Sequence, residues 1–255
     1  MLKRMIIGMI ALAALTLGGY ARAAMVTVDG VTWDTDHPLD FTMQGSLFES
    51  NIDTVGDTVE IWGLVNQINA SGGFCSGVCT ELTFYASALL TAAADTDGDG
   101  NLDLYFVDLT VSFYADTDGA DFDFLDPTTA QDGLLFLELS GHADVEGGVG
   151  AELFGEISGL ILAGLGDEGE GHGLLDAVGG DALALFDTNT ILDNQGTGFA
   201  DCNYSSSFQP SGVDGILTGT GEMLCDTDVI PEPASVLLMG LGLLGLAGLG
   251  RKRFF

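Results

Sequence analysis

The densest group of metal-ligating side chains in this sequence lies between Asp95 and Asp103, where the chain reads Asp-Thr-Asp-Gly-Asp-Gly-Asn-Leu-Asp. Carboxylates at alternate positions, a glycine at the sixth for a sharp turn, a carbonyl from the seventh and an Asp at the ninth can surround one Ca²⁺ with oxygen ligands. The sequence therefore predicts a calcium site. Its side chains are Asp95, Asp97, Asp99, Asn101 and Asp103.

This loop matches the first nine positions of an EF-hand calcium loop but not the last. Phe106 stands at the twelfth position, where an EF-hand has its bidentate Glu, and a strand-like alternation follows, so a helix–loop–helix is excluded. The motif resembles the calcium loops inserted between strands in many extracellular β proteins. An acidic turn that is merely solvated remains the alternative.

A second group of acids follows one predicted strand later. It comprises Asp116, Asp118, Asp121 and Asp123. Its spacing is less specific, and it can be read as a second cation site or as part of the first.

Catalytic motifs are not recognisable in this sequence. His37, His142 and His172 are scattered, and neither G-x-S-x-G nor H-E-x-x-H occurs. His142 lies near Asp144 and Glu146, and His172 lies in a Gly-rich acidic segment; both are read as turn or surface residues rather than metal ligands. We expect no enzymatic activity.

Four cysteines favour two disulfides where a chain is exported, as the two ends of this one indicate. We predict Cys75 with Cys79, across a short Ser-Gly-Val turn, and Cys202 with Cys225, across 22 residues. Closing the longer loop should stabilise the fold by roughly 3 kcal/mol. The other two pairings stay open, and a zinc site is disfavoured because no second Cys pair at zinc spacing and no nearby His accompanies them.

Residues 24–228 read as one domain of short, alternating strands. Alternation is clear in Thr58–Trp62, Glu81–Ala86, Gly133–Ser140 and Leu102–Tyr114. In the last of these the apolar phase slips by one residue at Phe106-Val107, which predicts a β-bulge or a strand that changes sheets. Asp181–Asp187 alone looks helical, with Asp181 as its N-cap. The predicted fold is mainly β, an antiparallel β-sandwich of eight or more strands.

The charge distribution separates this domain from the two ends of the chain. The sequence has 38 acidic residues and only six basic ones, which are Lys3, Arg4, Arg22, Arg251, Lys252 and Arg253. An all-acidic domain argues against nucleic acid as a partner, and its self-repulsion opposes folding unless salt or a divalent ion relieves it. Calcium could also bridge it to an anionic exopolysaccharide. A solvated, antiaggregation surface is the alternative.

The N-terminal end reads as a secretory signal peptide. Lys3 and Arg4 precede an apolar run, and Ala21-Arg22-Ala23 has small residues where a signal peptidase reads, so cleavage is expected after Ala23. The run is shorter than the ~20 residues of a spanning helix, which disfavours an uncleaved anchor.

Residues 229–255 have three parts. Pro231, Glu232 and Pro233 precede an apolar segment, 234–250, and the cluster Arg251, Lys252 and Arg253 follows it. The prolines keep the triplet extended, and the apolar segment can just span a thin bilayer as one helix. Basic clusters stay on the cytoplasmic side, so both ends place the domain on the outer face of the inner membrane.

This order of parts resembles the PEP-CTERM sorting signal of Gram-negative bacteria. The resemblance implies that exosortase recognises the tail and cuts near Pro231–Pro233, after the helix has anchored the precursor in the membrane. It covers about 25 residues and implies nothing about the activity of the domain. A plain single-pass anchor is the alternative.

Taken together, the residues predict an exported protein of the cell surface or extracellular matrix. It is expected to be structural or adhesive in exopolysaccharide or biofilm, and stabilised by calcium. The alternative is a calcium-dependent carbohydrate-binding module that uses exposed aromatics such as Trp33, Trp62 and Tyr85. A polysaccharide-active enzyme is a more distant alternative.

Overall fold

The computed structural model describes residues 25–35, 37, 41–50, 52, 54–146, 149–158, 168–196 and 198–227. The predicted signal peptide (1–23) and the sorting tail (229–255) lie outside these residues. Within the described part of the chain, no helix is both long and apolar enough to cross a membrane.

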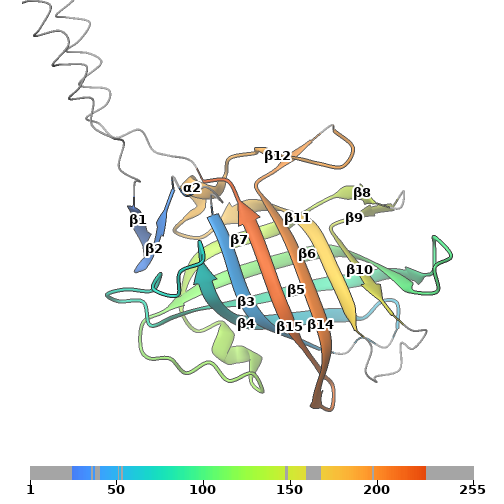
Figure 1. The fold of residues 1–255 in the computed structure, drawn as a ribbon, viewed down its shortest axis with the longest axis horizontal. Coiled ribbons are helices and arrows are strands. Elements are labelled where there is room, and N and C mark those ends of the chain that lie inside the picture. Colours follow the sequence, from blue (N-terminus) through green and yellow to red (C-terminus); the bar gives the residue numbers. More distant parts are fainter. Residues whose placement is uncertain are drawn as a thin grey trace, which may run out of the picture.

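The described chain is built almost entirely of antiparallel strands (Figure 1). The strands are β1 (Met25–Val28), β2 (Val31–Asp34), β3 (Phe41–Ser50), β4 (Thr58–Ile68), β5 (Glu81–Ala94), β6 (Leu102–Asp116), β7 (Leu134–His142), β8 (Asp144–Glu146), β9 (Val149–Ala151), β10 (Leu153–Ile157), β11 (Gly169–Gly179), β12 (Ile191–Leu192), β13 (Phe199–Ala200), β14 (Cys202–Val213) and β15 (Ile216–Cys225). Two short helices join them, the 3₁₀ helix η1 (Pro127–Ala130) and α2 (Leu183–Phe186).

One large sheet closes on itself. Its strands follow the order β10-β11-β14-β15-β3-β4-β5-β6-β7, and further pairings of β10 with β6 and of β7 with β11 join the two ends. Eight strand positions therefore form a barrel-like ring, with β3, β15, β14 and β11 crossing in front of β4, β5 and β6 (Figure 1). The predicted sandwich was wrong, because the two halves are continuous parts of one sheet.

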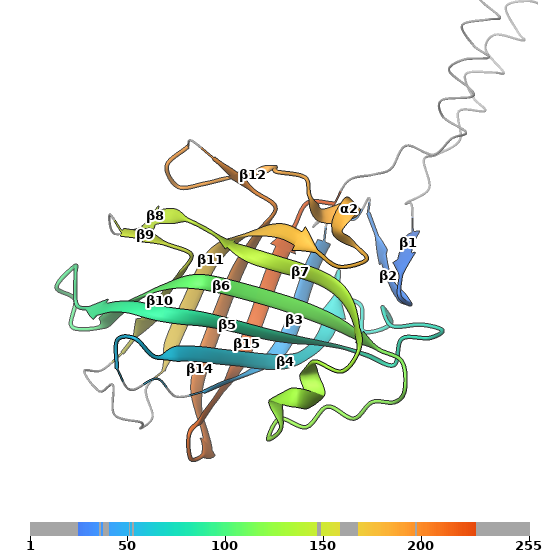
Figure 2. The same cartoon turned by 180° about the vertical axis from the view of Figure 1, so that it is seen from behind.

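Strands β7 and β10 share one position in this ring. β6 pairs with β10 over Leu102–Phe106 and with β7 over Thr110–Ala115, and β11 divides its pairing in the same way. Between β7 and β10 the chain leaves the sheet as the small β8–β9 hairpin, visible at the edge of Figure 2. The two strands thus act as one interrupted strand.

The change of partner coincides with a bulge in β6. Between Val107 and Thr110, two residues of β6 oppose one of β5, and Asp108 has a positive φ of 53°. Leu104 and Phe106 are buried before this point, and Leu109 and Val111 after it, so the inward phase shifts by one residue. The bulge lies where the slip at Phe106-Val107 predicted it.

An aromatic cluster closes one end of the ring. Trp33 packs edge-on against Phe41 and Phe136 at centroid distances of 5.5 and 5.9 Å, and Phe186 of α2 joins them. α2 is shorter than the predicted helix 181–187, and Ala182 rather than Asp181 occupies its N-cap without a side-chain hydrogen bond. Gly180 turns the chain into it with a φ of 89° and leaves no room for a Cβ beside the carbonyl of Phe136.

The structure pairs the cysteines as the sequence predicted. Cys75 bonds to Cys79, and Cys202 bonds to Cys225. The second bond links directly opposed residues at the open end of the β14–β15 hairpin, where both side chains are fully buried.

Removal of the two disulfides should have unequal effects. The double change Cys202→Ala and Cys225→Ala releases the longer loop and should lower the free energy of unfolding by about 3 kcal/mol, against about 2 kcal/mol for Cys75→Ala with Cys79→Ala. Urea titrations of the two double variants measure the difference. A larger loss from the Cys75 and Cys79 pair would contradict the loop-length explanation.

Candidate metal centres and pockets

The predicted calcium loop forms the tip of the β5–β6 hairpin. Asp95, Asp97 and Asp99 are exposed there, and one carboxylate oxygen of each lies within 4.8 Å of the others. Their side chains also hold the turn itself: Asp95 accepts from the N–H groups of Gly98 and Gly100 at 2.7 and 3.2 Å. Three of the five predicted ligands therefore lie close enough to share an ion.

The other two predicted ligands point to different partners. The Asn101 amide donates to Asp99 at 2.8 Å and to Glu156 at 2.7 Å. The buried Asp103 accepts from the backbone N–H of Thr96 at 2.8 Å and from its hydroxyl. The structure does not gather them with the three exposed acids.

A second carboxylate cluster combines Glu81 with Asp116 and Asp121. One oxygen of each lies within 4.8 Å of the others, and Glu81 and Asp116 are direct cross-strand neighbours at the ends of β5 and β6. Of the second predicted group, Asp116 and Asp121 belong to this cluster, while Asp118 contacts it by donating its N–H to Asp116 at 3.1 Å. Asp123 instead caps a local turn by accepting from the N–H of Leu125.

Glu81 was not among the predicted ligands. A signal for it did exist, because Glu81 lies about as far before the 95–101 loop as Asp116 lies after it. A hairpin centred on that loop places the two residues opposite each other. The sequence analysis considered only acids close together along the chain.

Burial and mutual repulsion disfavour the charged forms of the carboxyl groups in and beside the second cluster. Burial raises the pKa of Glu81, the N–H groups of Asp121 and Phe122 lower it in part, and repulsion from Asp116 raises it again. The hydrogen bond and the charge of Asp116 raise the pKa of Asp118. Burial and then repulsion from Asp132 and Asp116 raise the pKa of Asp121.

A third site is a pocket of about 280 Å³ on the outer face, where β10 and β11 meet β14 and the loop after β12. The ring centroids of Phe154 and His172 lie 5.1 Å apart there, with the rings tilted by 49°, beside Asn203 and Asn194. Asp144, which is 7 % exposed, accepts from the N–H of Asn194. An aromatic face, an imidazole and two amides make this pocket chemically mixed.

His142 and His172 have different surroundings. His142 Nδ1 lies 2.8 Å from Asp176 on the neighbouring strand, which is the one ion pair found within the described residues. His172 lines the mixed pocket, and His37 follows β2.

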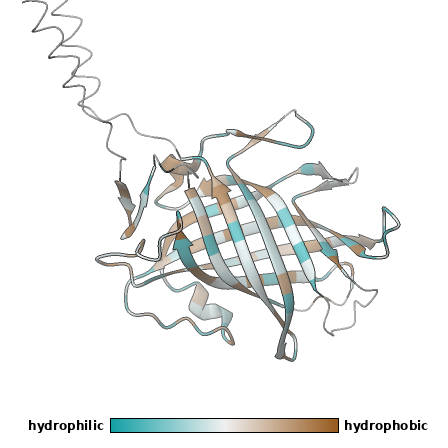
Figure 3. Ribbon diagram, in the orientation of Figure 1, coloured by the Kyte–Doolittle hydropathy of each residue, from teal (hydrophilic) through white to brown (hydrophobic). Residues whose placement is uncertain are grey.

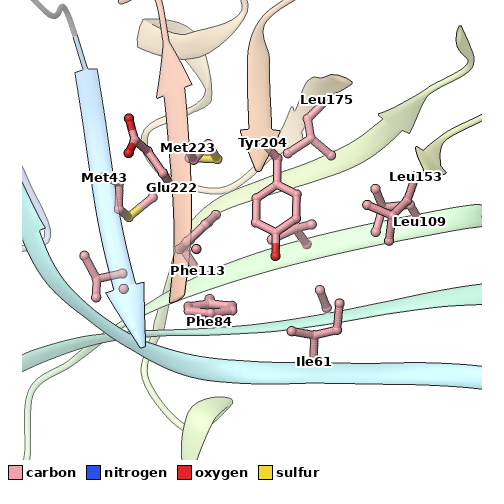
Figure 4. Close-up of a pocket in the computed structure, with 15 residues that line it drawn as sticks. Met43, Ile61, Phe84, Leu109, Phe113, Leu153, Leu175, Tyr204, Glu222 and Met223 are labelled. Atoms are coloured by element: carbon pink, nitrogen blue, oxygen red, sulfur yellow. The ribbon is translucent and has the colours of Figure 1, made fainter. Parts of the chain in front are cut away.

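The interior of the ring is a packed apolar core that contains a small cavity of about 40 Å³ (Figure 4). Met43, Ile61, Phe84 and Met223 line it, and the Tyr204 ring leans over Gly221, where a Cβ would lie 3.4 Å from the ring. A void of this size and lining stays dry and leaves no room for a large ligand.

Glu49 is an ionisable residue on the otherwise apolar inner face of β3. It follows Leu47 in the inward phase and is 9 % exposed. Burial raises its pKa to about 8. Its charge in turn contributes to the raised pKa of Tyr204, about 12, for which burial is the main cause.

Outside the described residues, the comparison with known families identifies the tail. Residues 229–253 match the family model described as the PEP-CTERM protein-sorting motif. The match supports a PEP-CTERM exosortase substrate. The motif implies an exported, membrane-anchored precursor with exosortase as its processing partner. No curated protein matches the chain.

Glu49 should make stability fall as the pH rises. In the unfolded chain this carboxyl ionises near pH 4.5, but in the folded protein it stays protonated up to about pH 8. The protonated form of Glu49 contributes to the free energy of unfolding, and this contribution is fully present below pH 4.5. It is lost as the pH rises through 8, and the total loss is about 5 kcal/mol. Glu49→Gln, which mimics the protonated form, should remove this loss.

Urea unfolding of the wild type and of Glu49→Gln at pH 5 and pH 8 tests this dependence. The difference between the two proteins should grow with pH. An equal change in both would show that Glu49 is not the group responsible.

Proposed function

We propose that this exported protein is a structural or adhesive component of the cell exterior, retained in anionic exopolysaccharide or biofilm through divalent cations. The observation that carries the proposal is the charge of the domain, which has no Lys or Arg between Arg22 and Arg251. Such a surface repels anionic polymers unless a cation lies between them.

The hairpin tip of Asp95, Asp97 and Asp99 supports this function, because it presents three exposed carboxylates to one ion at the outer end of a long hairpin. A Ca²⁺ ion takes six to eight oxygens, so three carboxylates leave positions for the carboxylates of a glycan. The same loop can therefore hold an ion and share it with a partner.

Co-sedimentation with an anionic polysaccharide such as alginate tests the proposal. The full-length protein should sediment with it in millimolar CaCl₂ and remain in solution with EDTA. Asp97→Asn combined with Asp99→Asn should reduce the bound fraction about tenfold, because two of the three shared charges are lost. Asp214→Asn, which removes one exposed acid at another hairpin tip, is the control.

Sedimentation that persists in EDTA, or that the Asp97 and Asp99 changes leave intact, would contradict the cation bridge. No reaction is assigned to the domain. Turnover of any member of a polysaccharide panel would therefore contradict a purely structural role.

A carbohydrate-binding module is the second candidate, and the mixed pocket favours it. Trp33 and Trp62, which the sequence suggested as exposed sugar platforms, are 2 % and 4 % exposed, so that prediction was wrong. Tyr85 is partly exposed and bonds to Glu60. The Phe154 ring with the amides of Asn194 and Asn203 offers the usual elements of sugar recognition instead, an apolar face and paired donors.

If the pocket binds a sugar, Asn203→Ala should weaken retention on one glycan at least tenfold, because a lost hydrogen bond leaves a polar group of the ligand unpaired. Glycan-array binding measures this effect. Gln209→Ala, on the same strand but outside the pocket, is the matched control. Retention that depends on calcium but not on Asn203 would favour the matrix protein.

A further inference from the structure

Two buried carboxylates lie opposite each other where the β5–β6 hairpin opens. Glu81, the first residue of β5, pairs directly with Asp116, the last residue of β6. Only 9 % of Glu81 and 3 % of Asp116 is exposed. Like charges directly opposite each other on a sheet are destabilising, and burial strengthens their repulsion.

The backbone satisfies these carboxylates only in part. Glu81 Oε1 accepts from the N–H groups of Asp121 and Phe122 at 3.0 and 2.9 Å, and Asp116 Oδ1 accepts from the N–H of Asp118. Asp116 Oδ2 is buried and has no hydrogen-bond partner. A buried carboxylate oxygen without a partner is costly, so its retention needs an explanation.

A positively charged side chain cannot supply that partner, since the domain has no Lys or Arg. Asp121 adds a third carboxylate, with one oxygen within 4.8 Å of an oxygen of Glu81 and of Asp116. We infer that Glu81, Asp116 and Asp121 bind one Ca²⁺ ion, and that the unpartnered Asp116 oxygen is a ligand. Ca²⁺ suits this site because it accepts irregular sets of oxygens, whereas Mg²⁺ demands a near-ideal octahedron and dehydrates reluctantly.

The inferred ion would hold a covering segment against the outside of the ring. Residues 117–131, which include η1, follow Asp116 directly and lie over β4 and β5 (Figure 2). The carbonyl of Phe124 accepts from Trp62 Nε1 at 3.0 Å, and the carbonyl of Ala130 accepts from the Thr83 hydroxyl at 3.1 Å. Phe48 stacks on Phe124 at 5.0 Å.

These contacts explain why Trp62 is buried although it belongs to the outer face of β4. Glu81 and Asp116 come from the ring, and Asp121 comes from the covering segment. An ion shared by the three carboxylates therefore joins the segment to the ring. Without the ion, their repulsion pushes Asp121 away and loosens the cover over Trp62.

This site is distinct from the exposed loop of the proposed function and does not rest on it. The inner ion stabilises the domain whether or not the outer loop meets a polysaccharide. The two can be separated, because Asp97 and Asp99 serve only the loop, and Glu81 and Asp116 serve only the inner site.

Thermal melts of the purified full-length protein, in mild detergent because its tail is apolar, test the inference. At a hundredfold excess of Ca²⁺ over its dissociation constant, the wild type should melt about 5 to 10 °C higher than in EDTA. MgCl₂ and NaCl at matched ionic strength should give a smaller rise. Ca²⁺ should also shift the Trp62 emission, and Trp62→Phe should abolish that shift.

Asp116→Asn is the decisive variant, because it removes both the ligand charge and the repulsion with Glu81. It should melt as high as the wild type or higher in EDTA, yet gain less from Ca²⁺ than the wild type and Asp97→Asn do. A merely structural role for Asp116 would lower the melting temperature in both conditions. Asp97→Asn is the control and should keep the calcium-specific rise.

Glu81→Gln gives a second test if Asp116→Asn does not fold, and equilibrium dialysis should show one Ca²⁺ fewer per chain. Identical melts of the wild type in Ca²⁺ and EDTA would overturn the inner site. A calcium-specific rise that is as large in both variants as in the wild type would do the same. Loss of polysaccharide sedimentation alone would instead count against the proposed function.

Discussion

The constraint on which the rest of the structure depends is that a strongly acidic domain must fold without a single Lys or Arg. Buried carboxylates therefore take their hydrogen bonds from backbone N–H groups. Asp201, 1 % exposed, accepts from Ala177 at 2.7 Å and from Thr188 and Asn189, so one side chain ties β11 to the chain after α2. Charge-assisted bonds to N–H groups are stronger than neutral ones, so acids here serve as connectors rather than as members of salt bridges.

The same use of acids appears where the sheet closes. Glu152 stands just before β10 and accepts from the N–H of Leu109 at 2.7 Å, while its own N–H donates to the carbonyl of Phe106 at 2.9 Å. It thus bridges the bulge of β6, where β7 gives way to β10. The exchange of β7 for β10 thus coincides with the bulge at Asp108, while β5 pairs with β6 on both sides of it. Gly141 passes so close to Glu152 that a Cβ would collide with its side chain.

Local features of this fold were predictable, and the long-range ones were not. Alternation located β4, β5, β6 and β7, and the phase slip at Phe106-Val107 located the bulge, because each depends on neighbours in sequence. Closure depends on β6 and β11 each pairing with both β7 and β10, which periodicity does not encode. Trp62 was misjudged for the same reason, since residues 117–131 cover it and nothing in its own strand shows this. The site residue Glu81 was missed because its partners are far away in sequence, Asp116 at the end of β6 and Asp121 in the segment that follows.

Glu49 and Asp116 are both buried carboxylates, and their different chemistry follows from their surroundings. Glu49 lies among apolar side chains on the inner face, where neutralisation by a proton is the available relief, and burial raises its pKa to about 8. Asp116 lies among other acids, where one divalent ion can neutralise several charges together. β5, β6 and two N–H groups already hold these ligands in place, so little ordering is left for binding. Extracellular modules bind Ca²⁺ at about 10⁻⁴ to 10⁻³ M, so a site of that class fills where calcium is plentiful. Export would then supply the ion that completes the cover over Trp62.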